Sequence, residues 1–199
     1  EAKWTYAGGV YDKLGSNSRL TTIDIGGGST EITTSANPIN TLNDLLTGQI
    51  TGKSMNIGSV RLNEKYLKNH PPAFDDIMNA EKFISEHLKG IDFDIVSTEL
   101  VGVAGTVTTL GAIVLGLNKF DANKVDGLNI SITEIENVLN RLIPMPIEEL
   151  YGMGDYMTGR ADIVIPGILI LKCFMRKFGF DNVKVSTKGL RYGVFLRDV

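Results

Sequence analysis

The stretch TTIDIGGGSTEITTS at residues 21–35 constrains the fold more than any other part of the chain, because two alternating segments flank three consecutive glycines. Alternation of apolar and polar residues is typical of half-buried strands, so residues 21–25 and 29–35 are each predicted to be strands. Residues 48–57 supply a third. The stretch therefore predicts three adjacent strands at the start of a sheet, with two hairpin-like connections.

The rest of the chain alternates helices with strands. Helices are predicted at residues 1–14 (before a polar loop), 60–67, 74–88, 106–117, 131–143, 160–178 and 190–198, and strands at 99–105 and 182–187. Pro71 and Pro72 separate two of these helices, Ser131 and Glu134 form a capping box, and hydroxyls at the start of 106–117 suit capping. This order predicts one α/β domain over residues 1–199, a mixed sheet flanked by helices.

Composition narrows the class of protein. Hydrophobic residues make up 43% and charged residues 22% of the chain, which is typical of an ordinary globular protein, and the formal charge is −3 with a pI near 5.4. This charge argues against a nucleic-acid-binding face. The most apolar stretch, 163–174, contains Pro166 and is too short to span a membrane. A single cysteine, Cys173, gives no disulfide. We therefore expect a cytoplasmic protein with neither nucleic acid nor membrane as a partner.

The three glycines suit a phosphate. Without Cβ atoms, the backbone N–H groups of Gly26, Gly27 and Gly28 can turn toward an anion, and the hydroxyls of Ser29 and Thr30 can donate as well. The alternative is a tight hairpin in which the aspartate is satisfied by hydrogen bonds within the fold. The pattern is neither a dinucleotide fingerprint nor a Walker loop, since no helix follows the glycines and no Gly-Lys-Ser/Thr is present.

Two carboxylates flank this turn, Asp24 before it and Glu31 after it. Carboxylates alone would repel a phosphate. A hydrated Mg²⁺ between them would offset their charge and bridge to phosphate oxygens, which makes both residues candidate metal ligands.

A second glycine turn, GVAGTVTTLGA at residues 102–112, runs from a strand into a helix. Unpaired N–H groups at a helix start favour anions, so Gly105 and Thr106 are candidate phosphate contacts. A glycine there is also explained by close packing of helix on sheet, and the pattern alone leaves both readings open.

Five motifs, IDIGGGSTE, GSVRLNE, GVAGTVTTL, GRADIVIPG and STKGLRYGV, occur in an order and spacing that closely resemble the second domain of the exopolyphosphatase and guanosine pentaphosphatase (Ppx/GppA) family. That family has the actin-like ATPase (ribonuclease H-like) fold. The resemblance covers nearly the whole chain. It implies that this chain is a second domain whose first domain, with another phosphate loop, is absent. The substrate site would then lie between the two domains.

The resemblance implies Mg²⁺-dependent hydrolysis of the terminal phosphoanhydride of polyphosphate, or of the 5′ γ-phosphate of guanosine pentaphosphate. Glu1 matches the family's general base, with Glu31 sharing the attacking water. Arg61 and Arg191 lie within family-like motifs and are candidate phosphate contacts. The family also implies a possible homodimer. A non-catalytic polyphosphate or nucleotide sensor and a kinase of the same superfamily are the alternatives.

Overall fold

The computed structural model describes residues 2–95 and 98–196. Within these ranges the strands are β1 (Leu20–Ile25), β2 (Thr30–Ser35), β3 (Ile50–Met55), β4 (Glu99–Val103), β5 (Asn129–Ser131) and β6 (Asn182–Val185). The helices are α1 (Ala2–Val10), α2 (Leu42–Thr47), α3 (Ser59–Tyr66), α4 (Phe74–Leu88), α5 (Ala104–Val114), α6 (Ala122–Val125), α7 (Ile132–Leu142), α8 (Ile147–Gly152), α9 (Val164–Phe178) and α10 (Leu190–Leu196). Short 3₁₀ turns occupy Tyr11–Lys13 and Asp155–Met157.

The strands form one mixed sheet in the order β3-β2-β1-β4-β6-β5. The first three strands are antiparallel neighbours, which confirms the predicted start of the sheet. β4 pairs in parallel with β1, and β6 in parallel with β4, whereas β5 closes the far edge antiparallel to β6. Parallel neighbours require crossover connections, and helices supply them.

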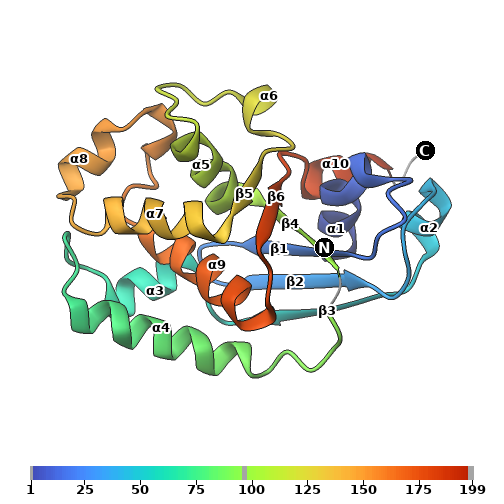
Figure 1. Cartoon of the computed structure of the whole chain (residues 1–199), viewed down its shortest axis with the longest axis horizontal. Helices are drawn as coiled ribbons and strands as arrows, with labels where there is room; N and C mark the ends of the chain where they lie inside the picture. The colour runs from blue at the N-terminus through green and yellow to red at the C-terminus, as the bar shows by residue number, and fades with distance from the viewer. Residues whose placement is uncertain (1, 96–97, 197–199) are drawn as a thin grey trace.

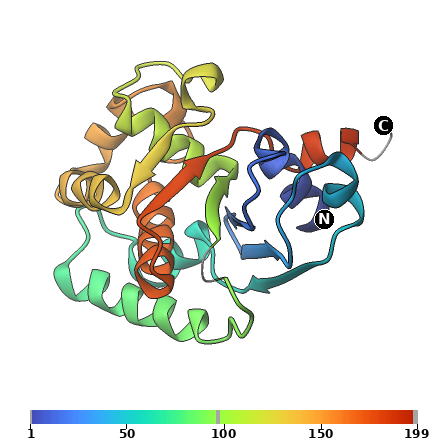
Figure 2. The same cartoon turned by 45° about the vertical axis from the view of Figure 1, so that its right-hand side comes forward.

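Helices cover the two faces of the sheet unequally (Figures 1 and 2). α4, α5, α7 and α9 lie on one side, where α9 contacts α3, α4, α5 and α7 over the larger apolar core. α1 and α10 lie on the other side, over a smaller apolar cluster that contains Tyr6, Leu20 and Val101. Alternation along β1 sorts its residues between these faces, with Ile23 and Ile25 in the larger core and Leu20 in the smaller.

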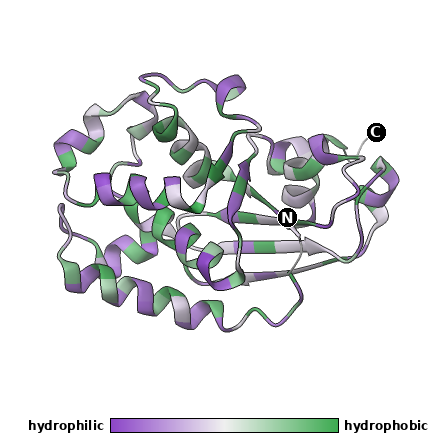
Figure 3. Ribbon diagram, in the orientation of Figure 1, coloured by the Kyte–Doolittle hydropathy of each residue, from purple (hydrophilic) through white to green (hydrophobic). Residues whose placement is uncertain are grey.

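The surface helices are amphipathic, as their periodicity predicted. Along α4 the buried positions are Ile77, Ala80, Ile84 and Leu88, at helical spacing, and Figure 3 shows hydrophobic and hydrophilic residues alternating along α4 and α7. The capping box of Ser131 and Glu134 is present at the start of α7. In the described part of the chain, no helix has both the length and the apolar character that crossing a membrane requires.

Several boundaries differ from the sequence prediction. α2 interrupts the second connection, which is therefore not hairpin-like, and its start is fixed by a capping box of Thr41 and Asp44. The short elements β5, α6 and α8 were not predicted. α9 begins at Val164 rather than residue 160, so that Pro166, which lacks an N–H, falls within the first turn. Within the described residues no side chain caps α5, so the predicted capping by hydroxyls there is wrong.

α1 and α10 cross with their backbones in contact. A Cβ atom on Gly193 would overlap the backbone carbonyl of Trp4, and one on Gly8 would overlap the carbonyl of Gly189. Only glycine permits this approach. The two helices therefore pack as a pair on the sheet.

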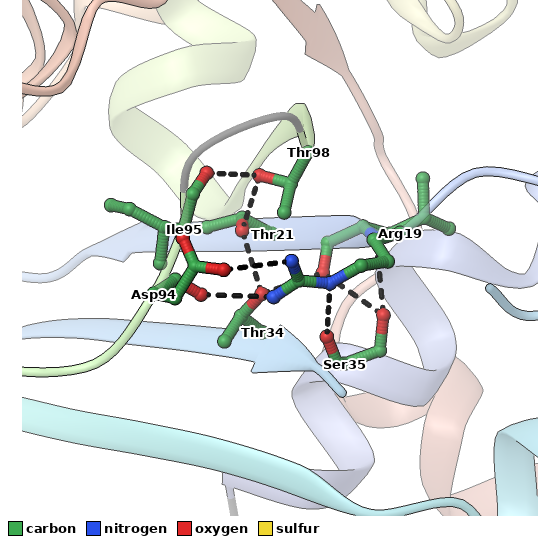
Figure 4. Close-up of polar contacts among 8 residues, drawn as sticks. Arg19, Thr21, Thr34, Ser35, Asp94, Ile95 and Thr98 are labelled. Carbon is green, nitrogen blue, oxygen red and sulfur yellow. Dashed lines mark hydrogen bonds and ion pairs between the residues drawn. The ribbon is translucent and has the colours of Figure 1, made fainter. Parts of the chain in front are cut away.

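A polar network fastens the segment that leads into β4 (Figure 4). The hydroxyl of Thr21 lies 3.0 Å from that of Thr34 and 2.7 Å from that of Thr98. The guanidinium of Arg19 donates to the carboxylate and to the backbone carbonyl of Asp94, each at 3.0 Å. Thr21 and Thr34 are buried, and each hydroxyl has a second partner besides the other: Thr98 for Thr21 and the backbone carbonyl of Leu20 for Thr34.

Candidate active site

A pocket of about 330 Å³ lies between α1 and the sheet. Its lining residues are Ala2, Thr5, Thr22, Asp24, Ser29, Glu31, Thr33 and Ser54. Two carboxylates and five hydroxyls line it, and the described lining residues include no basic side chain. The pocket therefore suits a cation, or a polar ligand that binds together with a cation.

Strand register explains how these residues meet. Asp24 of β1 pairs with Glu31 of β2, which pairs in turn with Ser54 of β3. These two carboxylates and one hydroxyl form a row across the sheet, here called the carboxylate row. Thr22 and Thr33 pair in the next row on the same face. The structure thus brings the two predicted metal ligands to directly opposite positions on one face.

The glycine turn, Gly26 to Gly28, is held in place by the start of α3. The N–H of Gly26 donates to the carbonyl of Ser29 at 2.9 Å and so closes the hairpin. The carbonyls of Gly26 and Gly27 accept from the N–H groups of Ser59 and Arg61 at 2.9 and 3.1 Å. A Cβ atom on Gly58 would lie 2.5 Å from the carbonyl group of Gly27, so the helix start and the turn are in backbone contact.

Amide donors remain at this turn. No carbonyl among the described residues accepts the N–H of Gly27, Gly28 or Ser29, whereas that of Gly26 is used in the hairpin. The guanidinium of Arg61 lies at the same turn, where its Nε donates to the carbonyl of Gly28 at 3.1 Å. The structure therefore places one predicted basic residue beside the predicted phosphate loop.

The hydroxyl of Thr30 differs from the prediction. It points to the opposite face of the sheet, where Thr30 is fully buried and its hydroxyl donates to the carbonyl of Ile57 at 2.7 Å. Alternation along β2 is the reason, because Thr30 lies next to Glu31 and must face the other way. The Thr30 hydroxyl is therefore a core contact and is directed away from the pocket.

At the second turn, Thr106 also has a packing role. Its hydroxyl donates to the carbonyl of Ile25 at 3.0 Å and ties the start of α5 to the end of β1. Gly105 is the residue on which the guanidinium of Arg160 rests, in the place that a Cβ atom would occupy. The sequence left open whether Gly105 is needed for close packing or for contact with an anion. The structure shows that it makes room for the guanidinium of Arg160.

Among the described residues, three predicted site residues line the pocket, namely Asp24, Ser29 and Glu31. Arg191 is exposed on α10 and does not line it. Glu1 lies outside the described residues, although Ala2 beside it in sequence does line the pocket. Sequence reasoning missed Thr5, Thr22, Thr33 and Ser54. The spacing of two residues from Asp24 to Thr22 and from Glu31 to Thr33 was the available signal for the threonine pair.

A model of the Ppx/GppA phosphatase family matches residues 1–199. Exopolyphosphatase 2 of Mycobacterium tuberculosis is 26% identical over 204 residues, which covers 98% of this chain and 60% of that protein. A bifunctional 3-dehydroquinate synthase/phosphatase of Fusobacterium nucleatum is 32% identical over 181 residues, covering 88% of this chain and 26% of that protein.

Solved structures agree with this relationship. The Ppx/GppA phosphatase of Aquifex aeolicus, in its type II variant, has a TM-score of 0.86 and 26% identity, and the match covers all of this chain and 63% of that one. The predicted actin-like ATPase type of α/β fold is confirmed. This chain spans about 60% of the length of Exopolyphosphatase 2. Because the family model matches the chain from its first residue to its last, the chain belongs to the Ppx/GppA phosphatase family.

Proposed function

We propose that this chain is the second domain of a Mg²⁺-dependent phosphohydrolase that removes the terminal phosphate of inorganic polyphosphate. The observation that carries the proposal is the carboxylate row, in which Asp24 and Glu31 are paired at the end of a glycine turn whose amide donors other than that of Gly26 are not bonded to any carbonyl of the described residues. Membership of a phosphatase family and similarity to Exopolyphosphatase 2 support it.

The residues present fit a magnesium ion. Mg²⁺ is typically bound through one or two carboxylates, with water filling its other positions. Asp24 and Glu31 supply two carboxylates, and a pocket of about 330 Å³ leaves room for coordinated water. Among the residues described, no group of three or more acidic, histidine or cysteine side chains could hold a metal ion. Water and phosphate oxygens would therefore complete the coordination that Asp24 and Glu31 begin. When bound, Mg²⁺ would stabilise negative charge that develops on the phosphate.

The protein's own groups would act on the phosphate from one edge of the sheet. The N–H groups of Gly27, Gly28 and Ser29 would donate to its terminal oxygens, and Arg61 would add a charge-assisted contact. Arg160, above Gly105, would contact a more distant phosphate of the chain. Glu31 would orient the attacking water together with Glu1, the general base implied by the family resemblance.

The remaining groups would come from a first domain that precedes this one in the full-length protein. The pocket is lined by carboxylates and hydroxyls, so the strongly negative substrate needs further cationic contacts. Closure of two domains would also exclude water and fix the reacting atoms. We accordingly propose that this domain alone has little activity.

Phosphate release by the full-length protein tests the proposal. Long-chain polyphosphate, guanosine pentaphosphate and ATP would be compared with and without Mg²⁺, and against the chain of residues 1–199 alone. We expect metal-dependent release from polyphosphate by the full-length protein. Release from guanosine pentaphosphate alone would change the substrate, and inactivity toward all three, with binding retained, would favour a sensor.

A further inference from the structure

Ser54 is a pocket residue that the proposed function does not yet use. It lies on the edge strand β3, and its hydroxyl donates to Oε1 of Glu31 at 2.6 Å. A carboxylate oxygen can only accept, so the direction of this hydrogen bond is unambiguous. Bonds to an ionised carboxylate are short and strong compared with neutral ones, and 2.6 Å lies within their range.

The contact between Ser54 and Glu31 follows from the register of the strands. Ser54 is the cross-strand partner of Glu31, just as Glu31 is the partner of Asp24, so one row across three strands ends with the serine. Ser54 is exposed at the rim, whereas Glu31 is half-buried. No donor among the described residues is bonded to Oε2 of Glu31. The serine therefore restrains one carboxylate oxygen and leaves the other for a ligand.

We propose that Ser54 is a positioning residue, which fixes the rotamer of Glu31 so that its second oxygen is presented to the metal and water in the pocket. This inference rests on the proposed function for the identity of the ligand. Metal-ligating carboxylates are commonly held by hydrogen bonds from neighbours, and loss of such a neighbour costs about 10- to 100-fold in affinity or activity. Ser54 makes this kind of contact.

The test uses three variants in the full-length protein. Ser54→Ala removes the hydroxyl, Ser54→Thr keeps it, and Thr51→Val removes a different hydroxyl from an exposed position on the opposite face of the same strand. The readouts are Mn²⁺ affinity by electron paramagnetic resonance, in place of Mg²⁺, and kcat and KM for polyphosphate. Thermal unfolding verifies that each variant is folded.

We expect Ser54→Ala to weaken Mn²⁺ binding and lower kcat by about tenfold or more, with KM for polyphosphate within about twofold. Ser54→Thr and Thr51→Val should behave as the wild type. Wild-type Mn²⁺ affinity and kcat in Ser54→Ala would overturn the inference, as would an equal loss in Thr51→Val. A wild-type protein that binds Mn²⁺ but releases no phosphate would refute the proposed function alone, because the metal titration still decides the role of Ser54.

Discussion

At the scale of single residues, Asp24 has the clearest expected role. It faces Glu31 across the hairpin and lines the pocket. The isosteric change Asp24→Asn removes a negative charge while the shape is kept, so metal affinity should fall because the amide is a weaker ligand. We expect kcat to drop more than about 100-fold and the Mg²⁺ concentration for half-maximal activity to rise.

A magnesium titration of the full-length protein checks this expectation. Glu86→Gln on α4 is the matched control, since Glu86 is exposed, pairs with Lys89 and is absent from the pocket lining. An unchanged titration in Asp24→Asn would exclude this carboxylate from the metal site.

A substitution at Gly58 tests whether backbone contact with the start of α3 holds the glycine turn in place. Its missing Cβ atom lets the start of α3 contact Gly27, so Gly58→Ala must displace either the turn or the helix. Overpacking of this kind costs about 1–3 kcal/mol, and the displaced amides should also lower activity. Gly152→Ala is the control, because no atom lies within 4 Å of its added Cβ. Urea unfolding and phosphate release measure the two effects, and wild-type values for both in Gly58→Ala would show that the contact is unimportant.

At the scale of elements, the threonine network should stabilise the junction of β1, β2 and the segment before β4. Thr21→Val keeps the side chain's shape but removes the hydroxyl that contacts those of Thr34 and Thr98. Those two hydroxyls still donate to the backbone carbonyls of Leu20 and Ile95, so the change costs two hydrogen bonds and leaves neither hydroxyl unsatisfied. A hydrogen bond contributes about 0.5–1.5 kcal/mol net, so loss of the two should cost about 1–3 kcal/mol. Chemical denaturation should show this loss of unfolding free energy, whereas Thr51→Val on exposed β3 should change it little. Equal stabilities for the two variants would mean that the network contributes nothing.

Sequence patterns predicted the elements that carry long periodic signals. The strands around the glycine turn and the helix α4 were predicted correctly because the periodic spacing of their apolar residues is enough to identify them. β5 has three residues and α2 has six, too few for a period to emerge. The candidate site followed the same rule. Asp24 and Glu31 were predicted because they flank one turn, but Ser54 joins them only through pairing with a strand some 20 residues later, and no local pattern encodes that register.

At the scale of the whole molecule, stability should depend on pH through His70. Burial lowers the pKa of His70 below its usual 6.5, despite the nearby Asp162 carboxylate, and neither ring nitrogen has a hydrogen-bond partner within the described structure. The unfolded chain therefore binds a proton more readily than the folded one. Stability should fall as pH decreases from about 6.5 through the folded pKa, and should be unaffected by this residue above that range.

Urea unfolding between pH 7.5 and pH 5 measures this effect. His70→Asn, which stays neutral throughout, should show a smaller loss of stability than the wild type over the same range. Carboxylates with lowered pKa values, such as Glu99 beside Ser18 and Lys13, lose their contribution only at more acidic pH, so they do not confound the comparison. Parallel pH curves for the two proteins would contradict the assignment to His70.

The glycine crossing of α1 and α10 has a mechanical consequence. Because the backbones touch at Gly8 and Gly193, neither helix can slide or rotate without pushing the other. Ala2 and Thr5 of α1 form one wall of the pocket. A displacement of α10 is therefore passed to that wall through two backbone contacts, at Gly8 and at Gly193. The width of the pocket should then change when either helix moves.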